Sequence, residues 1–173
     1  MLQNRWRGII CAVLFLACLS VSAHSRAAEP GEATSGAGEL SRTAVSSLDI
    51  VREIGLHQGK VVVVNFYAAW CPPCRREIPH LISLRESFSE SDVAIIGISL
   101  DDTHEDYARF VKSMKINYPT WRAGRGVMEF FEISAIPVVL YYNRENALQK
   151  RVVGLQPLAR MRANIEELLQ VKE

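Results

Sequence analysis

Two runs of β-branched and aliphatic residues dominate the hydrophobic pattern of the chain. They are KVVVVNFYA, residues 60–68, and VAIIGISL, residues 93–100. Such continuous runs are typical of strands that are buried on both faces of a sheet. Between them, apolar residues recur with a period of about 3.6 over residues 78–88, as in an amphipathic helix. The pattern predicts a β-α-β unit in which the first strand leads directly into Trp70 and Cys71.

Further helices and strands are predicted around this unit. Apolar residues recur at helical spacing in SSLDIVREIG (46–55, with Leu48, Val51 and Ile54), THEDYARFVKSMK (103–115) and PLARMRANIEELLQ (157–170). Two strand patterns, AIPVVLYYN and ALQKRVVG, lie on either side of the turn NREN. We therefore expect an α/β fold of three layers, with a central mixed sheet that ends in a hairpin and is flanked by helices.

The N-terminal segment follows a different pattern. Arg5 and Arg7 precede an apolar run, residues 8–23, that ends in small residues. A positive flank followed by a short apolar run is typical of an export signal. Cleavage is expected before His24 or before Ala28, which would release the protein into the periplasm.

Two alternatives to cleavage stay open for this segment. Residues 8–23 could be retained as a membrane tether, or a lipid could be attached at Cys18. Residues 29–42 are rich in Gly, Ala, Ser and Glu without apolar periodicity, as in a flexible linker. We thus expect a signal peptide or anchor at residues 1–28, a linker at 29–42 and one domain at 43–173.

Composition narrows the classes of partner. The 20 basic and 19 acidic residues leave a formal net charge of +1. A balanced charge produces no global field that attracts nucleic acid, so nucleic acid is not an expected partner. With 173 residues, the chain is long enough for one ordinary hydrophobic core.

The cysteines confine the candidate chemistry to one motif. Cys11 and Cys18 lie in the targeting segment, so Cys71 and Cys74 are the pair left in the predicted domain. A structural zinc site needs four ligands, and only His80 is near the pair in sequence, so no metal or other cofactor is expected. A purely structural disulfide across so short a loop would constrain the unfolded chain little. The spacing favours a redox-active dithiol.

The predicted junction of strand and helix places Cys71 where a thiolate is stabilised. A helix N-terminus carries about half a positive charge and several unpaired amide donors. Pro72 and Pro73 suit the first helical turn but have no N–H, so a Cys71 thiolate depends more on the Cys74 amide and the helix dipole. Cys71 is therefore the predicted nucleophile. Cys74, one turn inward, is the thiol expected to resolve a mixed disulfide.

The sequence around this motif resembles the thioredoxin fold. The resemblance rests on VVVVNFYAAWCPPCRREIP, VAIIGISLDD and FFEISAIPVVLYYN, and it covers about residues 43–171. More narrowly, the chain is similar to the TlpA/ResA-like exported thiol-disulfide oxidoreductases. A bare Cys-X-X-Cys motif would be weak evidence, but Trp70 before it and the downstream Ile-Pro make the likeness specific.

This resemblance implies roles for further residues. Pro137 would follow a cis peptide bond from Ile136, whose backbone would be free to pair with an extended substrate. Trp70 would shield the thiols. Asn65 stands where thioredoxin has a buried aspartate that takes part in proton transfer, and the group instead carries a functional glutamate at the position of Glu77. A buried Glu77 would have a raised pKa and could accept a proton from Cys74, whereas the alternative is a solvated helix glutamate.

The function implied by the resemblance is reduction of protein disulfides in the bacterial cell envelope, with a membrane thiol relay as electron donor. Disulfides of apocytochrome c or of a copper-site protein are the implied substrates. An oxidant that donates its disulfide, a thiol peroxidase, and a non-catalytic chaperone or metal-carrier module stay open as alternatives. The side chains themselves do not decide the direction of electron transfer.

Overall fold

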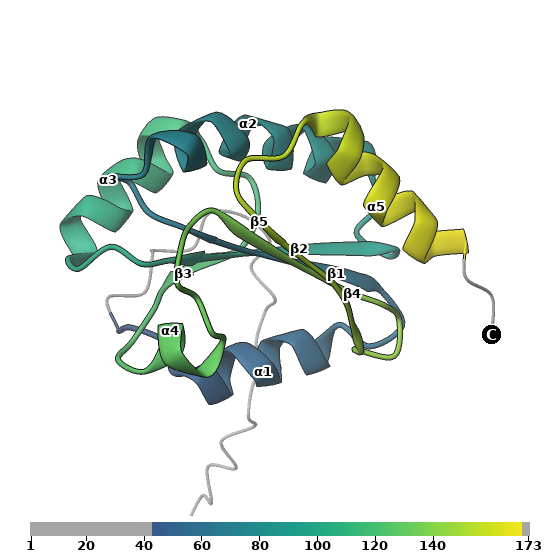
Figure 1. The fold of residues 1–173 in the computed structure, drawn as a ribbon, viewed down its shortest axis with the longest axis horizontal. Coiled ribbons are helices and arrows are strands. Elements are labelled where there is room, and N and C mark those ends of the chain that lie inside the picture. Colours follow the sequence, from purple (N-terminus) through teal and green to yellow (C-terminus); the bar gives the residue numbers. More distant parts are fainter. Residues whose placement is uncertain (1–42, 171–173) are drawn as a thin grey trace, which may run out of the picture. The chain divides into compact units, whose positions relative to one another are not determined.

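The computed structural model describes residues 43–170, and in this part of the chain five strands form one mixed sheet (Figure 1). In chain order they are β1 (Val61–Tyr67), β2 (Val93–Ser99), β3 (Thr120–Arg122), β4 (Val138–Tyr142) and β5 (Leu148–Val153). Their spatial order is β3-β2-β1-β4-β5. β1 and β3 pair with β2 in parallel, whereas β4 pairs with β1 and β5 in antiparallel fashion. The predicted mixed sheet with a terminal hairpin is confirmed.

Helices cover both faces of this sheet (Figure 1). Helices α2 (Pro72–Ser87), α3 (His104–Met114) and α5 (Leu158–Gln170) lie on one face. Helices α1 (Ser47–Leu56) and α4 (Val127–Phe130) lie on the other. This is the predicted three-layer α/β arrangement.

The burial of the central strand β1 explains the continuous apolar run at residues 60–68. All seven of its residues are buried. Val61, Val63 and Tyr67 belong to the core under α2 and α5, whereas Val62 and Phe66 belong to the core on the side of α1 and α4. Because successive side chains of a strand point to opposite faces, a strand covered on both sides must be apolar at nearly every position.

The orientation of α1 differs from the one its apolar spacing indicates. The buried residues are Ile50 and Ile54, while Leu48 and Val51 are 62% and 44% exposed. Ser46 caps this helix and forms a capping box with Asp49. In an amphipathic helix, either a spacing of three or a spacing of four residues can mark the buried face. Packing against the sheet selected the pair four residues apart.

Two elements were missed by the sequence pattern, namely β3 and α4. β3 has three residues and α4 has four, which is too short for a periodic signal. Both depend on tertiary contacts. β3 pairs with the end of β2, and Val45 forms a parallel bridge with Ala123 just beyond it.

Close packing of β2 against β3 yields a stability prediction. A Cβ on Gly97 would lie 2.7 Å from Oγ1 of Thr120 and 3.1 Å from Cε2 of Tyr118. Thr120 cannot easily shift, because its hydroxyl is hydrogen-bonded to the Tyr67 hydroxyl at 2.7 Å. We expect Gly97→Ala to lower the free energy of unfolding by about 1–3 kcal/mol through overpacking, measured by urea denaturation.

Gly55 in α1 is the matched control, because a Cβ there would have no neighbour within 4 Å. Gly55→Ala should raise the free energy of unfolding by about 0.5–1 kcal/mol through its higher helix propensity. If Gly97→Ala raised the free energy of unfolding as much as Gly55→Ala does, the neighbours of Gly97 would have to move aside without cost, which would contradict the prediction.

The predicted targeting segment, residues 1–28, and the predicted linker, residues 29–42, lie outside the described residues. Within residues 43–170, no helix combines the length and the apolar character needed to cross a bilayer.

Candidate active site

Strand β1 and helix α2 bring the two cysteines to one end of the sheet. After Tyr67 the chain makes a turn in which the Cys71 amide donates to the Ala68 carbonyl at 3.2 Å. Cys71 is the N-cap of α2, and Pro72 and Pro73 occupy the first helical positions. This is the arrangement that the two prolines predict, since proline is favoured where a helical N–H would have no partner.

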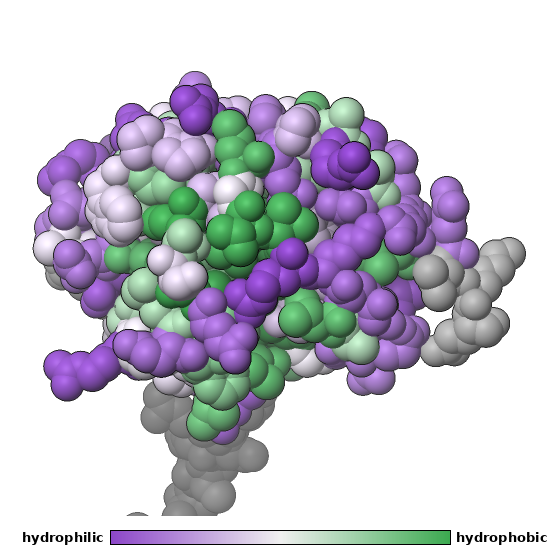
Figure 2. All heavy atoms as spheres, in the orientation of Figure 1, coloured by the Kyte–Doolittle hydropathy of each residue, from purple (hydrophilic) through white to green (hydrophobic). Residues whose placement is uncertain are grey.

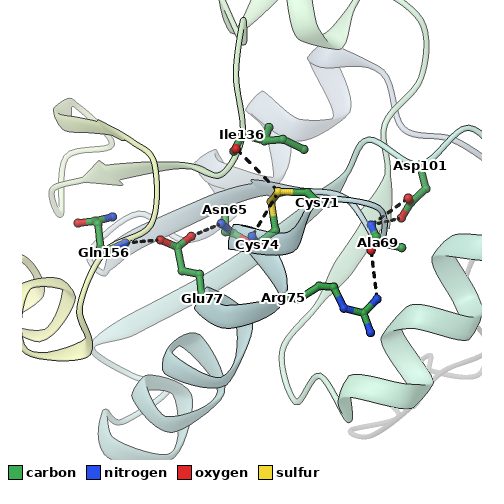
Figure 3. Close-up of a disulfide and its surroundings, with 9 residues drawn as sticks. All are labelled: Asn65, Ala69, Cys71, Cys74, Arg75, Glu77, Asp101, Ile136 and Gln156. Atoms are coloured by element: carbon green, nitrogen blue, oxygen red, sulfur yellow. Dashed lines mark hydrogen bonds between the residues drawn. A yellow bond between two sulfur atoms is a disulfide. The ribbon is translucent and has the colours of Figure 1, made fainter.

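Cys71 and Cys74 form a disulfide with an S–S distance of 2.07 Å (Figure 3). Both residues are nearly inaccessible, at 3% and 1% exposure. The Cys74 amide donates to Cys71 Sγ at 3.2 Å, which places an N–H of the first α2 turn on this sulfur. The same donor would stabilise a Cys71 thiolate after reduction.

The loop before β4 lies against the disulfide. The Ile136–Pro137 peptide bond is cis, as the resemblance implied. The Ile136 carbonyl oxygen lies 3.8 Å from Cys71 Sγ (Figure 3). Because a disulfide sulfur carries no hydrogen, this approach is a packing contact and not a hydrogen bond. It brings residues 65 positions apart in sequence to the same site.

An apolar groove of about 390 Å³ runs beside the disulfide. Its lining residues come from four segments and are Trp70, Cys71, Pro72, Pro73, Leu100, Met128, Ser134, Ala135 and Ile136. Trp70 is 66% exposed and is therefore no ordinary core residue. Figure 2 shows hydrophobic surface gathered between the two helix layers on the face presented in Figure 1, with hydrophilic residues around it.

Glu77 is fully buried on α2, one turn after Cys74 (Figure 3). Its carboxylate accepts a hydrogen bond from Asn65 Nδ2 at 3.1 Å and another from the Gln156 backbone N–H at 3.0 Å. Burial raises the pKa of the Glu77 carboxyl to about 7, although both hydrogen bonds oppose the shift. Glu77 is thus a buried carboxyl and not a solvated helix glutamate, and it is hydrogen-bonded directly to Asn65.

Similarity to known proteins agrees with this geometry. The AhpC/TSA family matches residues 46–142, more than half of the 173-residue chain. The chain belongs to the AhpC/TSA family. The matched segment extends from the cap of α1 to the end of β4, so it includes the cysteine pair and the cis-proline loop.

The chain is also similar to two proteins named "Thiol-disulfide oxidoreductase ResA". It is 27% identical over 112 residues to the one from Oceanobacillus iheyensis, covering 64% of this chain and 58% of the relative. It is 29% identical over 98 residues to the one from Bacillus subtilis, covering 56% and 55%. The chain therefore spans little more than half the length of these relatives. The names confirm the ResA-like resemblance of the sequence.

A solved structure shows the same fold. It is a thiol:disulfide interchange protein of the thioredoxin family from Chlorobium tepidum, with a TM-score of 0.62 and 25% identity. The alignment covers 66% of this chain and 83% of that one. The thioredoxin-like fold expected from the sequence is thus confirmed for this AhpC/TSA member.

Sequence analysis missed several buried polar residues near the pair. Gln156 lies 79 positions after Glu77 and donates its backbone N–H to the Glu77 carboxylate. Ser99 is the last residue of β2, and Asp101 follows shortly after it. An acidic residue directly after a buried strand was the available signal for Asp101. No local pattern distinguishes Gln156 from a surface glutamine.

The described residues, 43–170, contain no cluster of three His, Cys, Asp or Glu side chains that could hold a metal ion. His80, the one extra ligand considered near the cysteines, instead lies 3.0 Å from the Gln156 carbonyl oxygen through its Nδ1.

Proposed function

We propose that this protein is a thiol-disulfide oxidoreductase that reduces protein disulfides through the Cys71–Cys74 pair. The observation that carries the proposal is the disulfide at the N-terminus of α2, beside a groove and above a buried carboxylic acid with a pKa of about 7. The names of its ResA relatives support the same chemistry.

The first chemical step is attack of the Cys71 thiolate on one sulfur of a substrate disulfide. A mixed disulfide forms between Cys71 and the substrate, and the other substrate sulfur leaves as a thiolate. The helix N-terminus and the Cys74 amide stabilise the attacking thiolate. Pro72 and Pro73 tune its stability by withholding two further amide donors.

In the second step, the Cys74 thiolate attacks Cys71 Sγ. The mixed disulfide breaks, the second substrate sulfur is released as a thiolate, and the Cys71–Cys74 disulfide forms, so two electrons pass to the substrate. The Cys74 thiol must first lose its proton, and we assign Glu77 as the acceptor. Asn65 and the Gln156 amide orient the receiving carboxylate.

Substrate binding is assigned to the groove and the cis-proline loop. Trp70 forms one rim of the groove, and Ile136 lies against the attacking sulfur. Pro137 offers no N–H of its own, so an extended substrate segment would pair with the backbone of Ile136. A cysteine-containing segment lying along this loop would bring its sulfur to Cys71.

The proposed setting is the bacterial cell envelope. This proposal rests on the signal-like pattern of residues 8–23 and on the ResA resemblance. The electron donor that we propose there is a membrane thiol relay, and the proposed substrates are disulfides of apocytochrome c or of copper-site proteins. Mass spectrometry of membrane and soluble fractions tests it. A mature N-terminus at His24 or Ala28 means cleavage, and a lipid-modified Cys18 means anchoring.

The reduction potential of the full-length protein tests the direction of electron transfer. The protein is equilibrated in graded thiol buffers, and free thiols are trapped and counted by mass. We expect a value near that of thioredoxin, about −270 mV. A value near that of DsbA, about −120 mV, would identify a disulfide donor and overturn the proposed direction.

A further inference from the structure

The turn that presents Cys71 is held from two sides by charged side chains. Its central residue, Ala69, donates its N–H to both carboxylate oxygens of Asp101, at 3.0 and 3.2 Å. The carbonyl of Ala69 accepts from Arg75 Nη1 at 3.2 Å. Figure 3 shows the Ala69 backbone between these two side chains, on the side of the disulfide opposite Glu77. The chemistry proposed above leaves Asp101 without a role.

Asp101 is a buried carboxylate held by neutral donors. It is 3% exposed, and besides Ala69 it accepts a hydrogen bond from the Ser99 hydroxyl at 2.8 Å. Among residues 43–170, no Lys, Arg or His forms an ion pair with it. A buried charge without an ionic partner costs stability, so its position at the turn that holds the nucleophile calls for a functional explanation.

The negative charge of Asp101 affects the ionisation of a neighbouring side chain. Burial raises the pKa of the Tyr67 hydroxyl, and the charge of Asp101 adds to that shift. Asp101 also lines a polar groove beside this turn, whose other charged residues are Arg75, Asp102, Asp106 and Arg109. Asp106 and Arg109 are exposed and pair with each other at 2.9 Å, so their charges largely cancel. Asp102 is exposed, and its charge is screened by solvent. Arg75 is exposed as well, and its charge is screened by solvent.

We propose that Asp101 is a positioning residue that fixes the turn before Cys71 and, through its buried charge, keeps the Cys71–Cys74 pair strongly reducing. The Asp101 carboxylate is hydrogen-bonded to Ala69, two residues before Cys71. A thiolate at Cys71 adds a second negative charge near this carboxylate, and repulsion between like charges makes that thiolate less stable. A less stable thiolate disfavours the dithiol relative to the disulfide, which lowers the reduction potential. This inference rests on the proposed redox function and gives a structural reason for its direction.

The Asp101→Asn substitution in the full-length protein tests the negative charge of Asp101 separately from the shape of its side chain. The variant keeps the shape of the side chain and one oxygen that can accept from Ala69. We expect the apparent Cys71 pKa, measured from the pH dependence of alkylation of the reduced protein, to fall by about one unit. The equilibrium constant with glutathione should shift about tenfold toward the dithiol, which corresponds to about 30 mV.

Ser99→Ala is the matched control, because it removes a hydrogen bond from the same carboxylate and leaves the charge in place. It should lower the melting temperature while leaving the glutathione equilibrium within about twofold of wild type. Because Glu77 titrates in the same pH range, the alkylation profile is also recorded in the Glu77→Gln background.

The outcomes separate this inference from the proposed function. A potential unchanged by Asp101→Asn, or changed equally by Ser99→Ala, would overturn the role of the Asp101 charge even if the protein is a reductase. A wild-type potential in the range of an oxidant would overturn the proposed direction, whereas a tenfold shift on Asp101→Asn would still establish the positioning role.

Discussion

A Cys71→Ser variant is expected to lose all measurable reduction of protein disulfides. Serine has nearly the same shape, but its hydroxyl does not ionise near neutral pH and cannot form the mixed disulfide. The assay follows reduction of a model protein disulfide with dithiothreitol as electron source. The fold should be preserved, because the substitution removes one bond between residues three positions apart.

Cys74→Ser is the companion variant, with a different expected result. It retains the nucleophile but not the resolving thiol, so the reaction stops at the mixed disulfide. Mass spectrometry should show the protein joined to one substrate molecule, and a Cys71→Ser sample treated identically should show no adduct. An adduct on Cys74 with Cys71 absent would reverse the two assigned roles.

Glu77→Gln is expected to slow the resolving step about a hundredfold at neutral pH, since a glutamine cannot accept the proton of Cys74. Quenched-flow measurement of mixed-disulfide decay isolates this step. In the wild type, the decay rate should rise with pH through an inflection near 7, the pKa to which burial raises Glu77, and the variant should lack that inflection. Attack by Cys71 should be little affected.

The same substitution has a stability signature whose sign follows from linkage. The pKa of Glu77 is about 7 in the folded protein against a reference value of 4.5. Between these values the folded protein holds a proton that the unfolded chain has released, so stability falls as pH rises from about 5 to above 7. The loss attributable to Glu77 is on the order of 3 kcal/mol, measured by urea denaturation of the oxidised protein. This loss should be absent in Glu77→Gln.

Two features make this comparison clean. Asn65 Oδ1 is buried without a partner in the described part of the chain, so a flipped Asn65 amide can accept from the glutamine amide and restore the lost hydrogen bond. Glu86 is an exposed glutamate on the same helix and serves as the control. If Glu86→Gln changes the pH dependence as much as Glu77→Gln does, the effect does not arise from the buried carboxyl.

Local sequence was sufficient for the sheet centre and for the cysteine pair. β1 and β2 were predictable because a strand buried on both faces must be apolar throughout. The position of Cys71 was predictable because the prolines after it can begin a helix but cannot continue a strand. Each of these features is decided by residues within a few positions of one another.

By contrast, the environment of the pair was decided by tertiary structure. The raised pKa of Glu77 depends on its burial, and its hydrogen bond from Gln156 comes from a residue 79 positions away. The turn before Cys71 depends on Asp101, 32 residues away from Ala69. The exposed faces of Leu48 and Val51 likewise reflect how α1 packs on the sheet. The sequence by itself thus determined which atoms can exchange electrons. Only the packing of distant segments decided which charges and hydrogen bonds surround them, because burial and electrostatic fields are properties of the assembled core.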